Sequence, residues 1–90
     1  MIDMKVETGP TLTAGAFNVT FGQFEKVSEA VVVMDGPQVA DYAFEVLTSI
    51  ATNVVTVTVK KMQISAVNTW GNAVTADVAA KKFTVVAKGL

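Results

Sequence analysis

The chain has 90 residues, of which 51% are apolar and 17% charged, and its lysines and carboxylates leave a formal net charge of −1. A chain of this length forms one small domain, and its apolar content excludes intrinsic disorder. It contains no arginine, histidine or cysteine, which excludes disulfide frameworks, zinc sites and Ser-His-Asp or cysteine-based catalysis and argues against nucleic-acid binding.

Neither a targeting segment nor a membrane span is indicated. Residues 1–7 lack the basic region followed by an apolar region that defines a signal peptide. The longest apolar run, residues 30–34, is far shorter than the roughly 20 residues that a membrane helix needs. We therefore expect an unprocessed, soluble chain.

Valine and threonine dominate the sequence, and β-branched residues favour strands. Residues 4–8 are predicted to form the first strand, which Gly9 and Pro10 end. The segment 1–9 has two interpretations. It is either an edge strand of its own sheet or an arm that pairs with the sheet of a neighbouring molecule.

The next three predicted strands contain most of the aromatic residues. Residues 17–21 and 42–46 alternate apolar with polar or small side chains, so each is expected to bury one face. Residues 30–34 are apolar on both faces and end at the turn Asp35-Gly36-Pro37. This predicts either a central strand covered on two sides or a strand whose outer face meets another subunit.

The strictest alternation lies in residues 54–60, where Val55, Val57 and Val59 are predicted to share one buried face. At Lys60-Lys61 the apolar positions change parity, because Met62 and Ile64 follow. One inserted residue would produce this change, so we expect a β-bulge or a strand end near Lys61.

The carboxyl-terminal third is predicted to end in a strand over residues 83–88, closed by Gly89. Residues 73–82 tolerate either a helix or a strand, and we favour the strand. Six to eight short strands without a convincing helix predict a single all-β domain over residues 1–90, a small antiparallel β-sandwich with a barrel-like variant as the alternative.

Acidic residues suggest no active site or metal site. Glycosidase chemistry needs two carboxylates across a cleft, and the candidate pairs Glu25 with Glu29 and Asp41 with Glu45 are expected to be ordinary surface charges. Asp35 and Asp41 bracket a loop but lack the repeated spacing of a calcium site. We expect no catalytic residue, no metal and no cofactor.

The single tryptophan, Trp70, lies in a polar turn between Asn68 and Asn72. It could stack on a sugar, with Asn68, Asn72 and Asp35 or Asp41 as hydrogen-bonding partners. We favour instead a lid over the edge of the sandwich or a contact between subunits. The predicted subunit interface then consists of Val32, Met34 and Trp70.

The order of features over most of the chain resembles the H-type-lectin-like sandwich modules of phage virion and tail proteins. The residues that carry the resemblance are Gly15–Phe21 with Phe24, Val31–Val33, Phe44–Val46, Thr52–Val57, Trp70 and Phe83–Gly89. The resemblance implies a sandwich that assembles into trimers or larger rings, often on a virus particle, with carbohydrate binding in some members.

These observations predict a non-enzymatic structural protein that oligomerises through apolar surface. With so few charges, a 90-residue monomer would leave much apolar area in water, whereas a symmetric oligomer covers part of it. The expected role is a capsid-decoration or tail protein in a virion, whose partners are copies of itself and a larger viral shell. The alternative is a lectin-like carbohydrate-binding module, with the cytoplasm as the alternative location. Neither nucleic acid nor a membrane is an expected partner.

Overall fold

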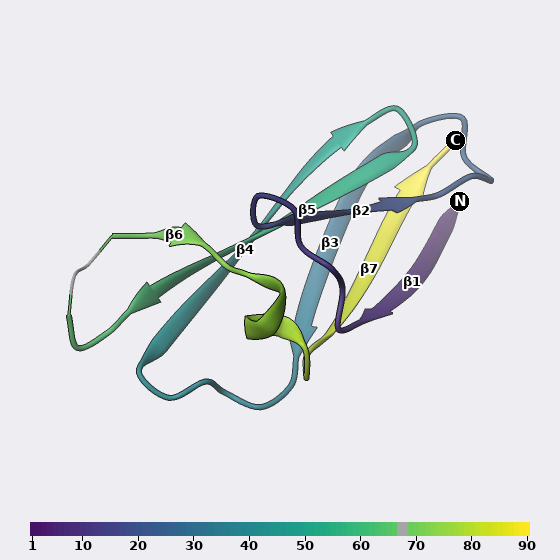
Figure 1. The fold of residues 1–90 in the computed structure, drawn as a ribbon. Helices are drawn as coiled ribbons and strands as arrows, with labels where there is room; N and C mark the ends of the chain where they lie inside the picture. The colour runs from purple at the N-terminus through teal and green to yellow at the C-terminus, as the bar shows by residue number, and fades with distance from the viewer. Residues whose placement is uncertain (67–68) are drawn as a thin grey trace.

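The computed structural model describes residues 1–66 and 69–90 as two antiparallel sheets packed in layers, which confirms the predicted all-β class. The three-stranded sheet has the order β1-β7-β3, and the four-stranded sheet has the order β2-β5-β4 with β6 beside β5. The layers do not close into a barrel (Figure 1). The strands are β1 (Ile2–Thr8), β2 (Ala16–Thr20), β3 (Val27–Asp35), β4 (Tyr42–Ala51), β5 (Val54–Gln63), β6 (Gly71–Asn72) and β7 (Lys82–Gly89).

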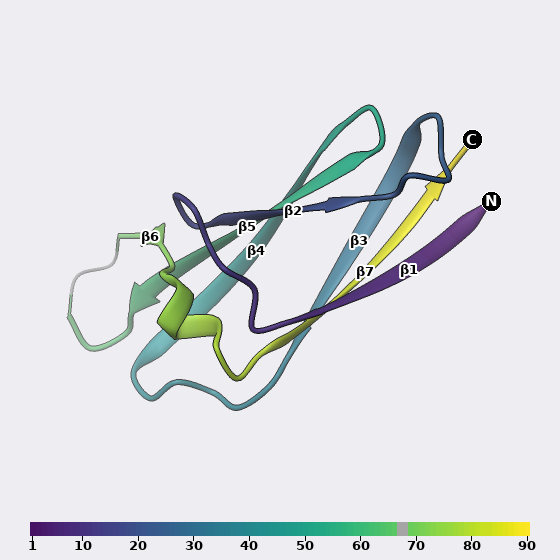
Figure 2. The same cartoon turned by 45° about the vertical axis from the view of Figure 1, so that its right-hand side comes forward.

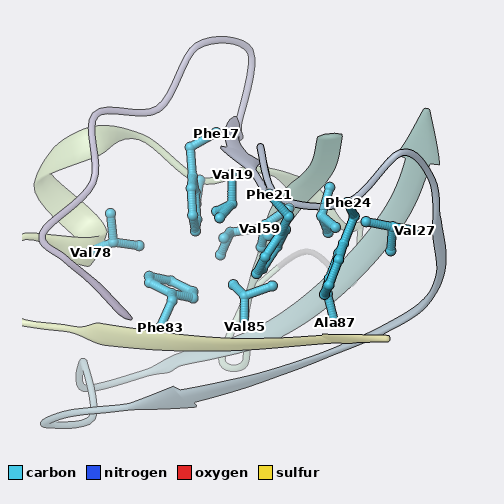
Figure 3. Close-up of a cluster of buried hydrophobic side chains, with 13 residues drawn as sticks. Phe17, Val19, Phe21, Phe24, Val27, Val59, Val78, Phe83, Val85 and Ala87 are labelled. Carbon is cyan, nitrogen blue, oxygen red and sulfur yellow. The ribbon is translucent and has the colours of Figure 1, made fainter. Parts of the chain in front are cut away.

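The hydrophobic core lies between β7 of one sheet and β2 with β5 of the other (Figure 3). Because side chains alternate along a strand, every second residue of these strands enters it. The rings of Phe17 and Phe83 meet edge to face across the layers with centroids 5.1 Å apart. The buried core residues are Phe17, Val19, Phe21, Phe24, Val27, Val55, Val57, Val59, Ala73, Val78, Phe83, Val85 and Ala87.

Strand β5 confirms the predicted alternation, because Val55, Val57 and Val59 are fully buried. The bulge considered for Lys61 is wrong, because Lys61 pairs with Phe44 of β4 without a register shift, and the strand instead ends close by, at Gln63. The Lys61 side chain points to the same inner face as Val55, Val57 and Val59, where its ammonium forms an ion pair with the Asp77 carboxylate at 2.9 Å. The apolar positions change from odd to even numbers after Lys60 because position 61 holds a lysine that forms an ion pair at the end of the core.

The strand favoured for residues 73–82 is also wrong. Thr75–Val78 forms a short 3₁₀ helix, η1, and β7 begins only at Lys82. The carboxylate of Asp77 accepts a hydrogen bond from the Val74 N–H at 2.8 Å, and this contact closes the first turn. Val78 then points into the core and covers one end of it (Figure 3).

Strands β3 and β4 are less buried than the central strands β5 and β7. Strand β4 extends to Ala51, and its aromatic half packs against the core through the half-buried Phe44 and Val46. Strand β3 is an edge strand of its sheet, which excludes the central position considered for residues 30–34. The register irregularity lies at the start of β3, between Val27 and Glu29.

Strand β1 begins at Ile2 and pairs with β7 over its whole length, so in this structure it is the other edge of its own sheet. It lies at the border of the molecule in both views (Figure 2). The strand ends where Gly9 adopts a φ of 56°, a left-handed conformation that glycine reaches without strain.

Candidate interaction surface

The outer face of the three-stranded sheet carries an array of apolar side chains, with Thr84 of β7 between Val6 and Val33. Met4 of β1 and Val31 of β3 both pair with Val86 of β7, so their side chains share one face of the sheet. That face is turned away from the core, since the alternate residues Val85 and Ala87 are buried. The array, called here the outer apolar array, consists of Ile2, Met4, Val6, Val31, Val33 and Val86.

Exposure within the array is high for side chains of this type. Ile2 is 70% exposed, Met4 57% and Val31 62%. Ile2, Val31 and Val86 line a shallow hollow of about 160 Å³. The largest apolar patch on a soluble protein is often functional, so this face is a candidate contact surface.

Charged cross-strand pairs frame the array at both ends. Glu29 pairs in register with Lys88 at one end, and Asp35 pairs with Lys82 at the other. Each end therefore combines one acid and one base. A charged frame around an apolar centre is the arrangement typical of protein–protein interfaces.

The structure places the sequence-predicted interface residues elsewhere. Val32 and Met34 lie on the inner face of β3, half-buried against the core, so Val31 and Val33 are the residues that project outward. Trp70 precedes β6 at 41% exposure and does not cover the core. The sequence prediction missed Ile2, Met4 and Val6, although their alternation with Asp3, Lys5 and Glu7 indicated an apolar face.

A second candidate site is a pocket of about 420 Å³ beside the β3–β4 loop. Lys81 reaches into its wall with only 4% of its surface exposed. Its ammonium donates to the Pro37 carbonyl at 2.7 Å and lies 5.0 Å from the centroid of the Phe44 ring. Tyr42 and Asp35 complete the aromatic and polar lining.

The residues expected to bind a sugar do not form one site in the described chain. The Asn72 side chain accepts a hydrogen bond from the Lys60 ammonium at 2.6 Å, on the outer face of the four-stranded sheet. Trp70 lines none of the hollows described above, whereas Asp35 lines the pocket beside Lys81. Asn68 lies outside the described residues.

Asp41 organises its own loop. Its carboxylate accepts hydrogen bonds from the Ser65 hydroxyl, the Gln63 amide and the Ser65 N–H. These hydrogen bonds hold the pKa of Asp41 below its usual value of 3.8. A carboxylate already engaged in this way has little capacity left for a ligand.

The candidate acid pairs are surface charges. Glu25, Glu29, Asp41 and Glu45 are all exposed. Across residues 1–66 and 69–90, no three metal-ligating side chains gather into a cluster. None of the described helical segments has the length and apolar content to cross a membrane.

Comparison of the chain with protein-family models, with curated proteins and with solved structures gave no match. The resemblance to H-type-lectin-like modules therefore stays a prediction from the sequence.

Proposed function

We propose that this chain is a non-enzymatic structural protein that assembles with copies of itself through the three-stranded sheet, and that the assembly is a virion component such as a capsid-decoration or tail protein. The observation that carries the proposal is the outer apolar array on all three strands of that sheet. Burial of apolar surface contributes about 25 cal/mol per Å², so covering this face favours association.

The size of the face favours more than one contact per chain. With a rise of about 3.3 Å per residue and about 4.8 Å between strands, the face measures only about 20 by 15 Å. A stable interface buries roughly 800 Å² on each partner, which this face alone does not supply. A multi-copy assembly, in which each chain also uses another surface, meets that requirement.

Two single substitutions, one on the outer face of each sheet, test the self-association. Val31→Lys places a charge in the outer apolar array, and Leu47→Lys places one on the outer face of the four-stranded sheet, where Leu47 is 46% exposed. We expect Val31→Lys to lower the mass measured by sedimentation velocity and Leu47→Lys to leave it unchanged. Equal masses for both variants and the unmodified chain would count against the proposal.

The virion location rests on the sequence resemblance and on the all-β layered fold. Immunogold labelling of virus particles from the chain's source tests it. Label on the head or tail of intact particles is the expected result. Label confined to soluble cell extract would contradict the location without bearing on self-association.

Carbohydrate binding is the second candidate function, and the pocket beside the β3–β4 loop favours it. An aromatic wall next to a few hydrogen-bonding groups is typical of small-ligand sites, and Tyr42, Phe44 and Asp35 supply these groups. Screening the chain on a glycan array, with Tyr42→Ala as the comparison, tests it. Binding that Tyr42→Ala abolishes would support this function, and a blank array would exclude it for the sugars tested.

A further inference from the structure

The outer edge of β1 carries backbone groups that no described partner uses. Hydrogen bonds at the two ends of the β1–β7 ladder run from Gly9 N–H to Lys81 C=O and from Gly89 N–H to Met1 C=O. Antiparallel ladders alternate between residues that bond the neighbour and residues that do not. Asp3, Lys5 and Glu7 therefore bond β7, and the even-numbered residues direct their N–H and C=O groups away from the sheet.

The other edge of this sheet, β3, makes a further backbone hydrogen bond at its first residue. The N–H of Val27 in β3 donates to the Thr52 carbonyl of the β4–β5 turn. Strand β1 pairs with β7 over its whole length and with no other described strand, so its outer edge is open for addition of another strand.

We propose that a second copy of the chain pairs antiparallel with β1, on a two-fold axis through Met4, so that two three-stranded sheets become one continuous sheet. This inference rests on the proposed self-assembly and names its contact. The pairing places Met4 opposite Met4 of the second copy and Ile2 opposite Val6.

Backbone geometry restricts the register to a few choices. The paired even-numbered residues must face one another, and the axes that pair most of β1 pass near its middle, through Met4, Lys5 or Val6. An axis through Lys5 sets Lys5 opposite its own copy and Asp3 opposite Glu7, and directly opposed like charges are unfavourable. An axis through Met4 sets Asp3 opposite Lys5 twice, and opposite charges in these positions stabilise the pair.

The side chains distinguish the two remaining registers. An axis through Val6 also pairs opposite charges, Lys5 with Glu7, but it sets Ile2 opposite Pro10, beyond the left-handed Gly9 that ends the strand. An axis through Met4 covers Ile2, which is the most exposed apolar residue of β1. This register therefore buries more apolar surface at equal charge complementarity.

Existing contacts of the charged residues remain compatible with this pairing. The Lys5 ammonium donates to the Thr20 carbonyl at 2.7 Å, and it retains two further donors for the Asp3 carboxylate of the second copy. Asp3 accepts a hydrogen bond from the Gln23 amide and still has lone pairs to offer.

Pairing at β1 also enlarges the surface on which the proposed function rests. A two-fold axis perpendicular to the sheet keeps both outer faces on the same side. The two outer apolar arrays then merge through Met4 and the Ile2–Val6 contacts into a surface about twice as wide. Pairing at β1 is therefore the additional contact that the outer apolar array, too small for a stable interface by itself, requires.

Single-cysteine variants test the register, because the chain has no cysteine of its own. Directly opposed residues lie about 5.5 Å apart at Cα, within disulfide range, whereas Val6 and its copy would be roughly 13 Å apart in the proposed register. We expect Met4→Cys to form a disulfide-linked dimer under mild oxidation and Val6→Cys, matched in exposure and edge position, to remain unlinked.

Every outcome of the oxidation bears on the proposal. Linking of Val6→Cys alone would establish the axis through Val6, and equal linking of both variants would indicate random collision; either result overturns the Met4 register. Absence of linking in both variants, with an oligomeric unmodified chain, rejects the Met4 register but leaves the proposed function standing. A monomeric unmodified chain at high concentration rejects the proposed function itself.

Charge reversal provides an independent measurement. Asp3→Lys and Lys5→Asp each place like charges opposite each other twice per dimer, so we expect each to weaken the dimer about tenfold. The double variant restores opposite charges and should recover most of the affinity, although both intrachain contacts are lost. Glu7→Lys is the matched control, with no expected change for an axis through Met4. A double variant weaker than both single variants would overturn the charge pairing.

Discussion

Lys61 occupies an inward-facing position of β5 at the end of the core, and Asp77 of η1 neutralises it at 2.9 Å. Burial raises the pKa of Asp77, but hydrogen bonds from the Val74 N–H and the Lys61 ammonium, together with the charge of Lys61, outweigh it and lower the pKa below 3.8. The contact joins β5 to η1 and so fixes the lid that places Val78 over the core.

We predict that Asp77→Asn lowers the free energy of unfolding by about 0.5–1 kcal/mol at pH 7, because water screens this partly exposed pair. The asparagine side-chain oxygen can still accept the hydrogen bond from the Val74 N–H, so the lost stability comes mainly from the missing negative charge beside Lys61. The folded-state pKa is depressed, so the contribution is complete above pH 4 and disappears as the pH falls through the folded value.

Urea denaturation of the two proteins at pH 7 and at pH 2–3 measures this dependence. The difference in free energy of unfolding between the unmodified chain and Asp77→Asn should be smaller at pH 2–3 than at pH 7. Glu25→Gln, which removes an exposed carboxylate instead, serves as the control. A difference that grows on acidification would contradict the assignment.

Residues whose environment is set by the nearest neighbours in sequence were the ones that could be predicted. Val55, Val57 and Val59 are buried as their alternation indicated. Lys61 could not be placed from its own strand, because its partner Asp77 is far along the chain and is brought near only by the fold. Residues 30–34 are all apolar, so no alternation shows which of them face the core. For that reason the sequence did not identify residues 31 and 33 as the outward positions.

The turn between β4 and β5 contains a local conflict between sequence and backbone. Thr52 adopts a φ of 55°, a left-handed conformation that a β-branched residue reaches only with strain. Asparagine tolerates this conformation. Thr52→Asn is therefore expected to raise the free energy of unfolding by about 0.5–1 kcal/mol, since it relieves part of that strain.

Thermal unfolding of Thr52→Asn against Thr48→Asn provides the comparison. Thr48 is equally exposed but belongs to the extended part of β4, where asparagine lowers strand propensity. We expect Thr52→Asn to raise the stability of the chain and Thr48→Asn to lower it. Equal destabilisation by both would show that Thr52 is not strained.

Strand β1 allows its two sets of backbone groups to be tested separately. Met4→Pro removes an N–H directed away from the sheet, so we predict a stability close to that of the unmodified chain and a loss of β1 pairing. Lys5→Pro removes an N–H that bonds β7 and leaves a carbonyl of β7 unpaired. We expect it to cost about 1–3 kcal/mol more than Met4→Pro.

Circular dichroism on heating, combined with sedimentation, measures both effects. If Met4→Pro unfolds as easily as Lys5→Pro, the alternation of hydrogen bonds along β1 is assigned incorrectly. If Met4→Pro is folded and retains the mass of the unmodified chain, β1 does not mediate assembly.

Long alternating strands were predictable, and short elements held by tertiary contacts were not. The final strand was predicted over residues 83–88, and β7 spans Lys82–Gly89. By contrast, η1 contains residues that tolerate several conformations, and the Asp77 contacts with Val74 and Lys61 determine its shape. The two-residue strand β6 exists only because it lies beside β5, so no local pattern could reveal it.

The described part of the chain is elongated for its length, with principal extents of 44 × 21 × 18 Å. The buried core occupies the centre, while the ends of β3 and β4 and the outer face of the three-stranded sheet stay in contact with water. A small domain buries a smaller share of its surface than a large one, so apolar residues left outside are costly. Assembly offers a physical reason for their retention.

Composition predicted this excess of apolar surface but not its location. Counting apolar residues indicates that a surface must be covered, whereas only the register of β1, β7 and β3 shows that six of them gather on one face. The candidate surface therefore could not be derived from the sequence without the strand order.

Native mass spectrometry of the unmodified chain over a range of micromolar concentrations tests the account most directly. Each chain has a mass of 9.5 kDa. Self-association through β1 and the outer apolar array predicts an even-numbered assembly, with a dimer as its smallest unit, that Asp3→Lys weakens about tenfold. A species of 9.5 kDa at every concentration, or a trimer without a dimeric unit, would contradict it.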